Sequence, residues 1–447
     1  MKQTRLVPAL AAFGIAAAGL AGCGDDDKST DSAASPAAVA PTTASTDVKG
    51  TVNVLATWSA AEQKSFQAVI DAFEAKYTGV TVKYKSGGDN TPTLLSTAVE
   101  GGNPPDVAAV AQPGTIKEFQ EKGALQPLDF AEDTVEAEYP ADIVKLGKID
   151  DKQYSFVFKA ANKSTVWYNT AAFTDAGVTP PKTWEEFLSN AKTIGGSGTP
   201  AYSIAGADGW TLTDLFENIY LRQAGADKYD QLTEHEIPWT DQSVKDALTS
   251  MADIFKDTDN LVGGTSGALQ TEFPTSVENV FQDPAKGAQV IEGDFVPGVV
   301  ADKTKLKAVE GYDVFDFPSV NGSGPAVVGG GDSIVLFTEN EAAKAFVEYL
   351  ASAEAQTVWA KRGGFSSANK SVDTAVYPDE LSKKTAGAIA TAETFRFDMS
   401  DLAPAAFGGT PGQGEWKALQ DFLEKPADVD GAADALEKAA AKAYDKQ

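Results

Sequence analysis

The sequence contains one cysteine and one histidine in 447 residues. A single thiol forms no internal disulfide, and it cannot build the zinc sites that need several thiolate ligands. A catalytic triad or an imidazole zinc centre would have to use His235, yet zinc catalysis normally needs two or three imidazoles. No H-E-x-x-H or nucleophile-elbow motif is present. We therefore interpret His235, in the charged stretch LTEHEIPW, as a surface residue, and we expect no catalytic residue, no metal ion and no other cofactor.

Basic residues are scarce relative to acidic ones. The chain has 37 Lys and Arg against 64 Asp and Glu, which gives a formal net charge of −27. An acidic chain of this kind is repelled by nucleic acid and by anionic lipid surfaces, so neither is an expected partner. Long uncharged apolar runs are also missing after residue 22, so we expect the remaining chain to fold as a soluble body.

The N-terminus carries one uncharged apolar run. The cationic start MKQTR precedes LVPALAAFGIAAAGLAG, which is short for a membrane span and rich in Ala and Gly. A positive start followed by such a run is typical of a secretory signal. Residues 1–22 are therefore expected to be a signal peptide.

The signal ends in Leu20-Ala21-Gly22-Cys23, which resembles the bacterial lipobox. The resemblance implies that Cys23 receives a diacylglyceryl thioether and becomes the new N-terminus. The alternative is a chance cysteine at the end of an ordinary signal. Residues 24–49 are almost entirely Asp, Ser, Thr, Ala and Pro, so they bury too little apolar surface to fold. We expect 23–49 to be a lipidated, disordered tether, with the protein anchored to the outer face of the bacterial cell membrane through lipid alone.

The body of the chain alternates strands and helices. Residues 51–58 predict a strand that ends at Trp58, and Ser59 with Glu62 predicts a capping box for the next helix. Strands at 79–84 and 106–111, with a helix between them at 93–100, favour a doubly wound parallel sheet rather than a sandwich or a bundle.

Further elements are expected downstream. Thr183 and Glu186 predict a second capping box, and Asp241 begins a helix with an apolar stripe. The stretch DVDG at 428–431 lacks the terminal glutamate of a calcium loop, so it is interpreted as a helix start or turn. The other expected elements are strands at 164–169 and 332–337, one helical stretch at 339–363, and a mostly helical C-terminal region. Trp184 and Trp416 are assigned to packing.

Several segments together resemble the extracellular solute-binding proteins of the carbohydrate type, which serve ABC importers. The most specific is STVWYNTAAFTDAGVTPPKTWEEFLSNAKTI, and FRFDMSDLAPAAFGG resembles the branch with alpha-glucoside-binding members. Supporting segments are GGNPPDVAAV, AQVIEGDFVPGVV, VVGGGDSIVLF and RGGFSSANK. The resemblance implies an α/β fold of two hinged lobes, similar to periplasmic binding proteins, with a ligand cleft between them.

The same resemblance implies where the lobes divide. Lobe one would comprise 50–160 and 326–372, and lobe two 163–318 and 375–447. The hinges would then fall near 159–163, near 319–325 and at Val372.

A sugar cleft needs aromatic plates for the apolar C–H faces of the ligand and polar side chains for its hydroxyls. Trp58, Asp89 and Gln112 follow predicted strands, where ligand groups of α/β sheets gather. Phe295 stands where the family's pattern often has a stacking tryptophan. The alternatives are core packing for the aromatics, turns for Asp89, Gln112 and Asp332, and an ion pair between lobe elements for Arg396 and Asp398. The expected ligand-binding residues are Trp58, Asp89, Gln112, Trp210, Asp294, Phe295, Asp332, Arg396 and Asp398.

The function that these expectations favour is capture of a sugar, a disaccharide or short oligosaccharide such as an alpha-glucoside, and its delivery to the permease of an ABC importer. The protein would act as a monomer and not as an enzyme. The alternative is a secreted glycoside hydrolase, which also needs aromatics and paired carboxylates, but no segment resembles a hydrolase signature. A lectin-like adhesion protein would predict β-rich patterning, which the chain lacks.

Overall fold

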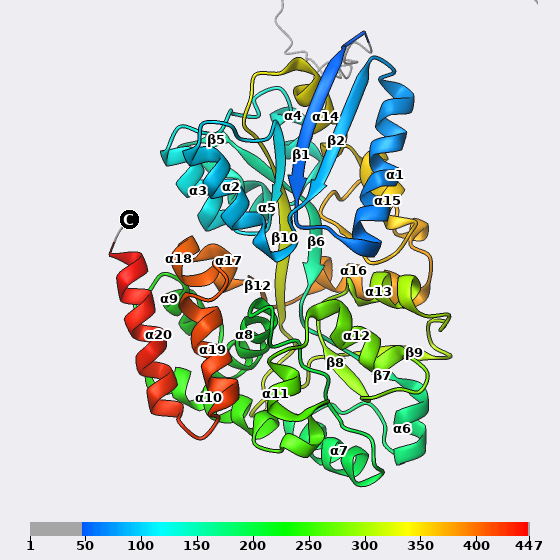
Figure 1. The fold of residues 1–447 in the computed structure, drawn as a ribbon, viewed down its shortest axis with the longest axis vertical. Helices are drawn as coiled ribbons and strands as arrows, with labels where there is room; N and C mark the ends of the chain where they lie inside the picture. Colours follow the sequence, from blue (N-terminus) through cyan, green and yellow to red (C-terminus); the bar gives the residue numbers. More distant parts are fainter. Residues whose placement is uncertain (1–46, 446–447) are drawn as a thin grey trace, which may run out of the picture. The chain divides into compact units, whose positions relative to one another are not determined.

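A mixed sheet of seven strands lies within residues 47–445, the part of the chain that the computed structural model describes (Figure 1). The side chains of Asp89, Asp142, Ala390 and Thr391 are outside this description. The strand order is β11-β6-β10-β3-β1-β2, and β12 pairs with β10. The strands are β1 (Gly50–Ala56), β2 (Val80–Ser86), β3 (Val107–Val110), β6 (Ser155–Asn162), β10 (Val327–Leu336), β11 (Ser366–Ser367) and β12 (Phe395–Phe397).

The expected parallel sheet is formed only in part. β1 is parallel to β2 and to β3, as the strand–helix alternation predicts. β10 is antiparallel to both β3 and β6, so the prediction of a wholly parallel sheet is wrong. A parallel neighbour needs a crossover on the same sheet, whereas β10 follows β9 (Tyr312–Asp316) of the other sheet and enters from the opposite end (Figure 1).

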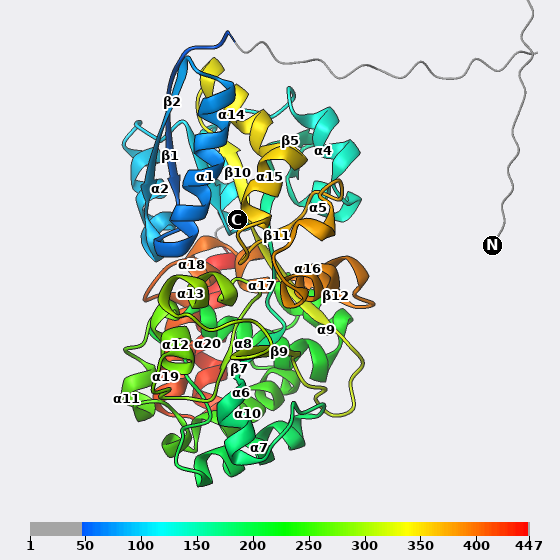
Figure 2. The same cartoon turned by 90° about the vertical axis from the view of Figure 1, so that its right-hand side faces the viewer.

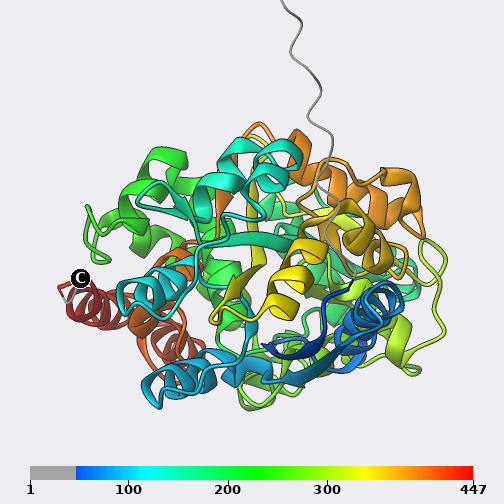
Figure 3. The same ribbon diagram turned by 90° about the horizontal axis from the view of Figure 1, so that it is seen from above.

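The two faces of β1 enter different cores. Val52 and Val54 pack with Phe66 of α1 (Ala60–Lys76) and with Phe346 of α14 (Glu341–Ala351), whereas Leu55 packs with Phe119 of α3 (Pro113–Glu121). Successive side chains of a strand point to opposite faces, which explains this division. Figures 2 and 3 show α1 in blue beside α14 and α15 (Ala353–Ala360) in yellow. The elements around this sheet are called lobe one below.

A three-stranded antiparallel sheet, in the order β8-β7-β9, forms the centre of the second group of elements, called lobe two below. Its largest core surrounds α8 (Trp210–Ala224), which is buried over most of its length, and packs it against α10 (Gln242–Phe255). The other elements of lobe two are β7 (Thr165–Asn169), β8 (Gln289–Ile291), α6 (Thr170–Ala176), α7 (Trp184–Gly196), α9 (Ala226–Thr233), α11 (Gly264–Ala268), α12 (Phe273–Phe281), α13 (Val296–Lys303), α17 (Met399–Leu402), α18 (Ala405–Gly408), α19 (Gly414–Glu424) and α20 (Val429–Tyr444).

Smaller elements complete the described chain. They are α2 (Thr91–Glu100), α4 (Glu132–Glu138), α5 (Ala141–Leu146), the hairpin of β4 (Lys148–Ile149) and β5 (Lys152–Gln153), α16 (Glu380–Thr391), and the 3₁₀ turns at Gly88–Asn90, Thr258–Asn260 and Thr374–Val376.

Three of the helix starts predicted from capping residues are present in the structure, and one predicted capping box is not. The box at Thr183 and Glu186 is present, and Asp241 caps α10. Asp428 accepts a hydrogen bond from the Gly431 N–H, which confirms DVDG as a helix start. The box at Ser59 and Glu62 is not formed, because the Ser59 side chain makes no capping hydrogen bond.

Two other local predictions need correction. The single helix predicted at 339–363 is two helices, because the Ser352 side chain caps α15 by accepting from the Ala355 N–H. The His235 side chain is 18% exposed, lies 3.3 Å from the Glu437 carboxylate and packs on Tyr444, so it is half-buried rather than on the open surface.

The predicted signal peptide, Cys23 and most of the tether lie outside the described residues. In residues 47–445 no helix has the length and apolar character to cross a membrane. The lobe limits predicted from the sequence, 50–160 with 326–372 and 163–318 with 375–447, remain a proposal.

Candidate functional site

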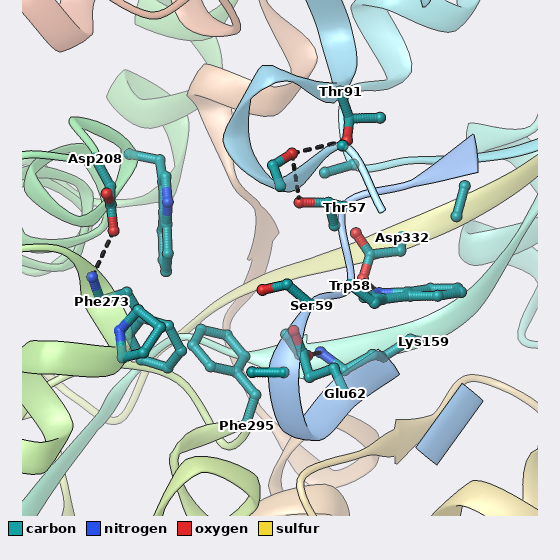
Figure 4. Close-up of a pocket in the computed structure, with 18 of the residues that line it drawn as sticks. Thr57, Trp58, Ser59, Glu62, Thr91, Lys159, Asp208, Phe273, Phe295 and Asp332 are labelled. Carbon is teal, nitrogen blue, oxygen red and sulfur yellow. Dashed lines mark hydrogen bonds and ion pairs between the residues drawn. The ribbon is translucent and has the colours of Figure 1, made fainter. Parts of the chain in front are cut away.

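A cavity of about 420 Å³ lies where the two lobes meet (Figure 4). Lobe one contributes the segments that follow β1, β2 and β3, together with parts of β6 and β10. Lobe two contributes the starts of α8 and α12 and residues along the whole of α13, with single residues from α17 and α19. The lobe-one segments are the ones that follow the carboxyl ends of parallel strands, where ligands of α/β sheets commonly bind.

Three aromatic rings form the wall of the cavity on lobe two. Trp210, Phe273 and Phe295 contact one another, with ring centroids 5.1 to 6.0 Å apart and steep angles between the planes. Trp210 and Phe273 are half-buried, whereas Phe295 is 9% exposed. This wall therefore presents apolar ring surface to the cavity, mainly from Trp210 and Phe273.

Backbone geometry holds Trp210 in this wall. Gly209 precedes it with a φ of 80°, a left-handed conformation that suits glycine. A Cβ at Gly209 would come within 2.7 Å of Trp416, so Trp416 packs directly beneath this turn. The neighbouring Asp208 accepts a hydrogen bond of 2.5 Å from the Phe273 N–H, which ties the start of α12 to the start of α8 (Figure 4).

The wall on lobe one is polar at the cavity and aromatic behind it. The Trp58 indole N–H donates a 2.7 Å hydrogen bond to Asp332, and both residues line the cavity. Trp58 itself is fully buried against Phe66, Phe158 and Trp359. Asp332 lies at a register shift of β10, and such bulges often redirect a side chain toward a site.

Hydrogen bonds connect the loops that follow β1 and β2 beside the cavity. The hydroxyls of Thr57 and Thr91 both donate to the Gly88 carbonyl, at 3.1 and 2.7 Å (Figure 4). The backbone of Asp89 follows in the 3₁₀ turn Gly88–Asn90, beside cavity residues. The Asp89 side chain is outside the described atoms, so its role as a ligand residue stays a prediction.

A salt bridge forms part of the cavity wall. Lys159 of β6 is buried, and its Nζ is 3.0 Å from Oε1 of Glu62 in the first turn of α1. The same ammonium lies 5.0 Å from the centroid of the Phe295 ring. Burial lowers the pKa of Lys159, but Glu62, Asp332 and Asp294 outweigh that effect and hold the pKa above its usual value, so the group stays charged.

A second buried lysine, Lys163, lies where the chain leaves β6 for β7. Its Nζ is 3.0 Å from Asp214, 2.6 Å from Asp398 and 3.5 Å from Asp401. Burial works against the charged form of Asp398, but Lys163 holds the pKa of Asp398 below its usual value. Burial raises the pKa of Asp214 well above its usual value, because Lys163 does not fully compensate for it. One lysine therefore holds one carboxylate ionised within a larger group of buried acids.

Asp401 connects this group to the other lobe. Its Oδ1 accepts a 3.2 Å hydrogen bond from the Gln112 side-chain amide at the start of α3, and both residues line the cavity. Burial, and then the charge of Asp398, raise the pKa of Asp401 to about 8. Another contact between the lobes is the ion pair of Lys64 on α1 with Asp302 on α13, where the Lys64 side chain is 66% exposed and that of Asp302 16%.

The structure brings together five of the nine predicted ligand residues. Those that line the cavity are Trp58, Gln112, Trp210, Phe295 and Asp332. Asp294, Arg396 and Asp398 are not among the lining residues: Asp294 accepts from the Ser366 hydroxyl, Arg396 pairs with Asp230, and Asp398 pairs with Lys163. Arg396 and Asp398 thus form ion pairs with separate partners, which agrees with the alternative that the sequence left open for them.

Sequence reasoning missed several lining residues. Lys159 and Lys163 lie in the predicted hinge segment, and an isolated lysine in a β-rich stretch was the available signal. Phe273 follows Glu272 in TEFP, which carries no distinctive pattern. Trp416 was assigned to packing and is 3% exposed, yet it also contributes to the lining. Among the described residues no group of acidic, histidine or cysteine side chains has the arrangement of a metal site.

Comparison with known proteins identifies what the chain resembles. Residues 57–357 match the family model of the bacterial extracellular solute-binding proteins. An alpha-glucosides-binding periplasmic protein of Rhizobium meliloti is 32% identical over 403 residues, which cover 87% of this chain and 86% of the relative. An osmoprotective compounds-binding protein of Synechocystis is 32% identical over 371 residues, covering 81% and 86%.

Solved structures show the same fold at lower sequence identity. A bacterial solute receptor with a preference for β-D-galactopyranose superimposes with a TM-score of 0.77 at 21% identity, covering 89% of this chain and 100% of the receptor. A raffinose complex of a solute-binding protein gives 0.73 at 20% identity, covering 89% and 100%. These structures bear on the fold alone, and they have two lobes, as the resemblance in the sequence implied.

Proposed function

This chain belongs to the bacterial extracellular solute-binding proteins of ABC transporters, and we propose that its cavity captures a neutral sugar for delivery to an importer. The ligand is a disaccharide or short oligosaccharide, such as an alpha-glucoside. The observation that carries the proposal is the contrast between the two walls: aromatic rings on lobe two face hydrogen-bonding side chains on lobe one.

That contrast matches the chemistry of a sugar ring. Its C–H faces are apolar and stack on aromatic rings such as Trp210 and Phe273. Its hydroxyls need both acceptors and donors, which Asp332, Gln112 and Lys159 supply. The cavity volume of about 420 Å³ falls in the usual range for small-molecule sites.

The charges favour a neutral ligand over an anionic one. Lys159 is paired with Glu62, and Lys163 is surrounded by three aspartates. An anionic sugar would compete with these carboxylates in a region of low dielectric constant. The name of the Rhizobium meliloti relative, which refers to alpha-glucosides, supports a neutral sugar as the ligand.

Ligand capture in a cleft of this fold closes the lobes about their hinges. The contacts from Gln112 to Asp401 and from Lys64 to Asp302 join the lobes, so both are candidates for contacts that closure makes. We propose that the protein leaves its ligand chemically unchanged, and that a permease with its ATPase receives the closed complex.

A thermal-shift screen tests the proposal. Ligand at 100 times its Kd adds about 2.7 kcal/mol to the free energy of unfolding, so one of maltose, trehalose, sucrose or raffinose is expected to raise the melting temperature. Glucuronate serves as the anionic control and should leave it unchanged. Flat melting with every neutral sugar would refute the carbohydrate assignment, and chromatographic detection of a cleaved sugar would favour the hydrolase alternative.

We also propose that Cys23 carries the lipid anchor, which rests on the lipobox-like sequence LAGC alone. Cys23→Ala should release the protein from bacterial membrane pellets into the soluble fraction. Unchanged pelleting of the variant would contradict lipidation.

A further inference from the structure

The first turn of α1 departs from local helix rules at several consecutive residues. Ser59 has the backbone conformation of an N-cap, but its side chain makes no capping hydrogen bond. Ala60 has a φ of 47°, a left-handed conformation that non-glycine residues seldom adopt. Glu62 occupies the position from which a capping box would reach back to the Ser59 N–H. All three residues line the cavity.

The Glu62 side chain is used elsewhere. It pairs with Lys159 at 3.0 Å, and the two side chains lie next to one another in the cavity (Figure 4). The Glu62 side chain is 26% exposed and that of Lys159 only 5%. Local rules that are broken at consecutive residues, without a local gain, are expected at functional sites. The start of α1 thus lacks the Ser59 cap, and it carries a charged pair that faces the cavity.

The Lys159 ammonium is held in place from several sides. Phe295 supports it at 5.0 Å, and the Phe295 ring in turn lies against Gly293, where an added Cβ would come within 2.4 Å of the ring. Lys159 on β6 pairs in register with Asp332 on the neighbouring β10. The Asp332 carboxylate also accepts a hydrogen bond from the Trp58 indole N–H. Because the Phe295 ring is only 9% exposed and already contacts Lys159, Trp210 and Phe273, it positions Lys159 rather than offering an open plate.

We propose that Glu62 and Lys159 form the specificity-determining pair of the cavity, which recognises two neighbouring hydroxyls on one ring of the bound sugar. The Glu62 carboxylate accepts a hydrogen bond from one hydroxyl, and the Lys159 ammonium donates to the oxygen of the next. Their separation of 3.0 Å suits the close spacing of hydroxyl oxygens on adjacent ring carbons. The inference rests on the proposed sugar-binding function and adds the residues that discriminate between sugars.

A set of deoxy sugars tests the pair. The probes are the tightest binder among maltose, trehalose, sucrose and raffinose, and its monodeoxy derivatives, measured by titration calorimetry. A hydrogen bond to a charged group is worth enough to change Kd by roughly ten- to a hundredfold. The wild type should lose affinity by that factor for two derivatives, which lack adjacent hydroxyls, and by less for the others.

Glu62→Gln and Lys159→Met should bind the parent sugar about ten- to a hundredfold more weakly. In both variants the Kd of those two deoxy derivatives should differ little from the Kd of the parent sugar. For the other deoxy derivatives, the ratio of Kd to that of the parent sugar should stay as in the wild type. The control is Lys148→Met, which removes a lysine outside the cavity lining that pairs with Glu136 at 2.6 Å and Glu132 at 3.1 Å and is more exposed than Lys159. It should behave as the wild type throughout.

Wild-type discrimination ratios in both Glu62→Gln and Lys159→Met would overturn the pair while leaving sugar binding established. Failure of the wild type to bind any of the four sugars would overturn the proposed function and this inference with it. If Lys159→Met does not fold, as judged by circular dichroism, the isosteric Glu62→Gln decides the question alone.

Discussion

Replacement of Asp401 by asparagine should change how the stability of the protein depends on pH. Asp401 is buried, and its pKa is raised from 3.8 in the unfolded chain to about 8 in the folded one. The charged groups that face it are Asp398, Lys163, Asp332 and Glu415. Burial and the negative neighbours outweigh the single lysine, which gives the upward direction.

The sign of the effect follows from proton binding. Between pH 3.8 and about 8 the folded protein holds a proton on Asp401 that the unfolded chain has released. The free energy of unfolding therefore falls as pH rises through this window, by up to about 1.4 kcal/mol per pH unit for this one group. An asparagine side chain does not titrate, so the Asp401→Asn variant should gain stability relative to the wild type as pH rises from 5 to 8.

Urea denaturation followed by circular dichroism at pH 5, 6, 7 and 8 measures this difference. Asp241→Asn is the control whose stability curve should run parallel to that of the wild type between pH 5 and 8, because the hydrogen bonds from Ser243, and then Lys228, lower the pKa of Asp241 to about 2, below this range. The stability that Asp241 contributes is present above pH 3.8 and is lost as pH falls toward 2. Parallel stability curves for wild type and Asp401→Asn between pH 5 and 8 would refute the reasoning about the buried acids.

Three further predictions follow from the cavity and its support. Trp210→Ala removes a half-buried ring system of the aromatic wall. It should weaken sugar binding by at least about 2 kcal/mol, or roughly thirtyfold in Kd, by calorimetry; an unchanged Kd would exclude a stacking role. Lys163→Met leaves Asp398 buried without its cation, so it should lower the free energy of unfolding by about 3–5 kcal/mol in urea titrations. Adding Asp398→Asn should restore part of this loss. Equal stability of wild type and Lys163→Met would contradict the assignment of charge to Asp398. Gly209→Ala places a Cβ against Trp416 at positive φ and should cost about 1 kcal/mol or more and also weaken binding; wild-type melting and affinity would show that the turn tolerates a side chain.

Local patterns in the sequence predicted local structure well where each residue satisfied only local interactions. Thr183 and Glu186 form their box, and the apolar stripe that begins after Asp241 is buried in the core of lobe two. The box at Ser59 and Glu62 is not formed: Ala60 between them has a φ of 47°, and Glu62 pairs with Lys159, which is distant in the sequence. A propensity rule cannot anticipate that pair, since it depends on which strand lies opposite.

The same limit applies to the cavity. Trp58, Gln112 and Asp332 could be predicted because they follow strands or glycines, which are visible in one sequence. Phe273 and Asp401 could not, because they reach the cavity only after the second lobe has folded and returned its helices to the first. The antiparallel direction of β10 has the same origin, since the strand comes back from the other lobe rather than through a crossover helix.

The ion pair of Lys64 with Asp302 has a practical consequence, because the chain has no cysteine other than Cys23. Once Cys23 is replaced, Lys64→Cys and Asp302→Cys would supply the only two thiols, one on each lobe. Dyes attached at these positions would report the separation of α1 and α13, so fluorescence transfer between them would rise when a sugar closes the cleft. The protein is in this way a ready starting point for a fluorescent sugar sensor, in which Asp302 is the cavity-lining residue that the labelling replaces.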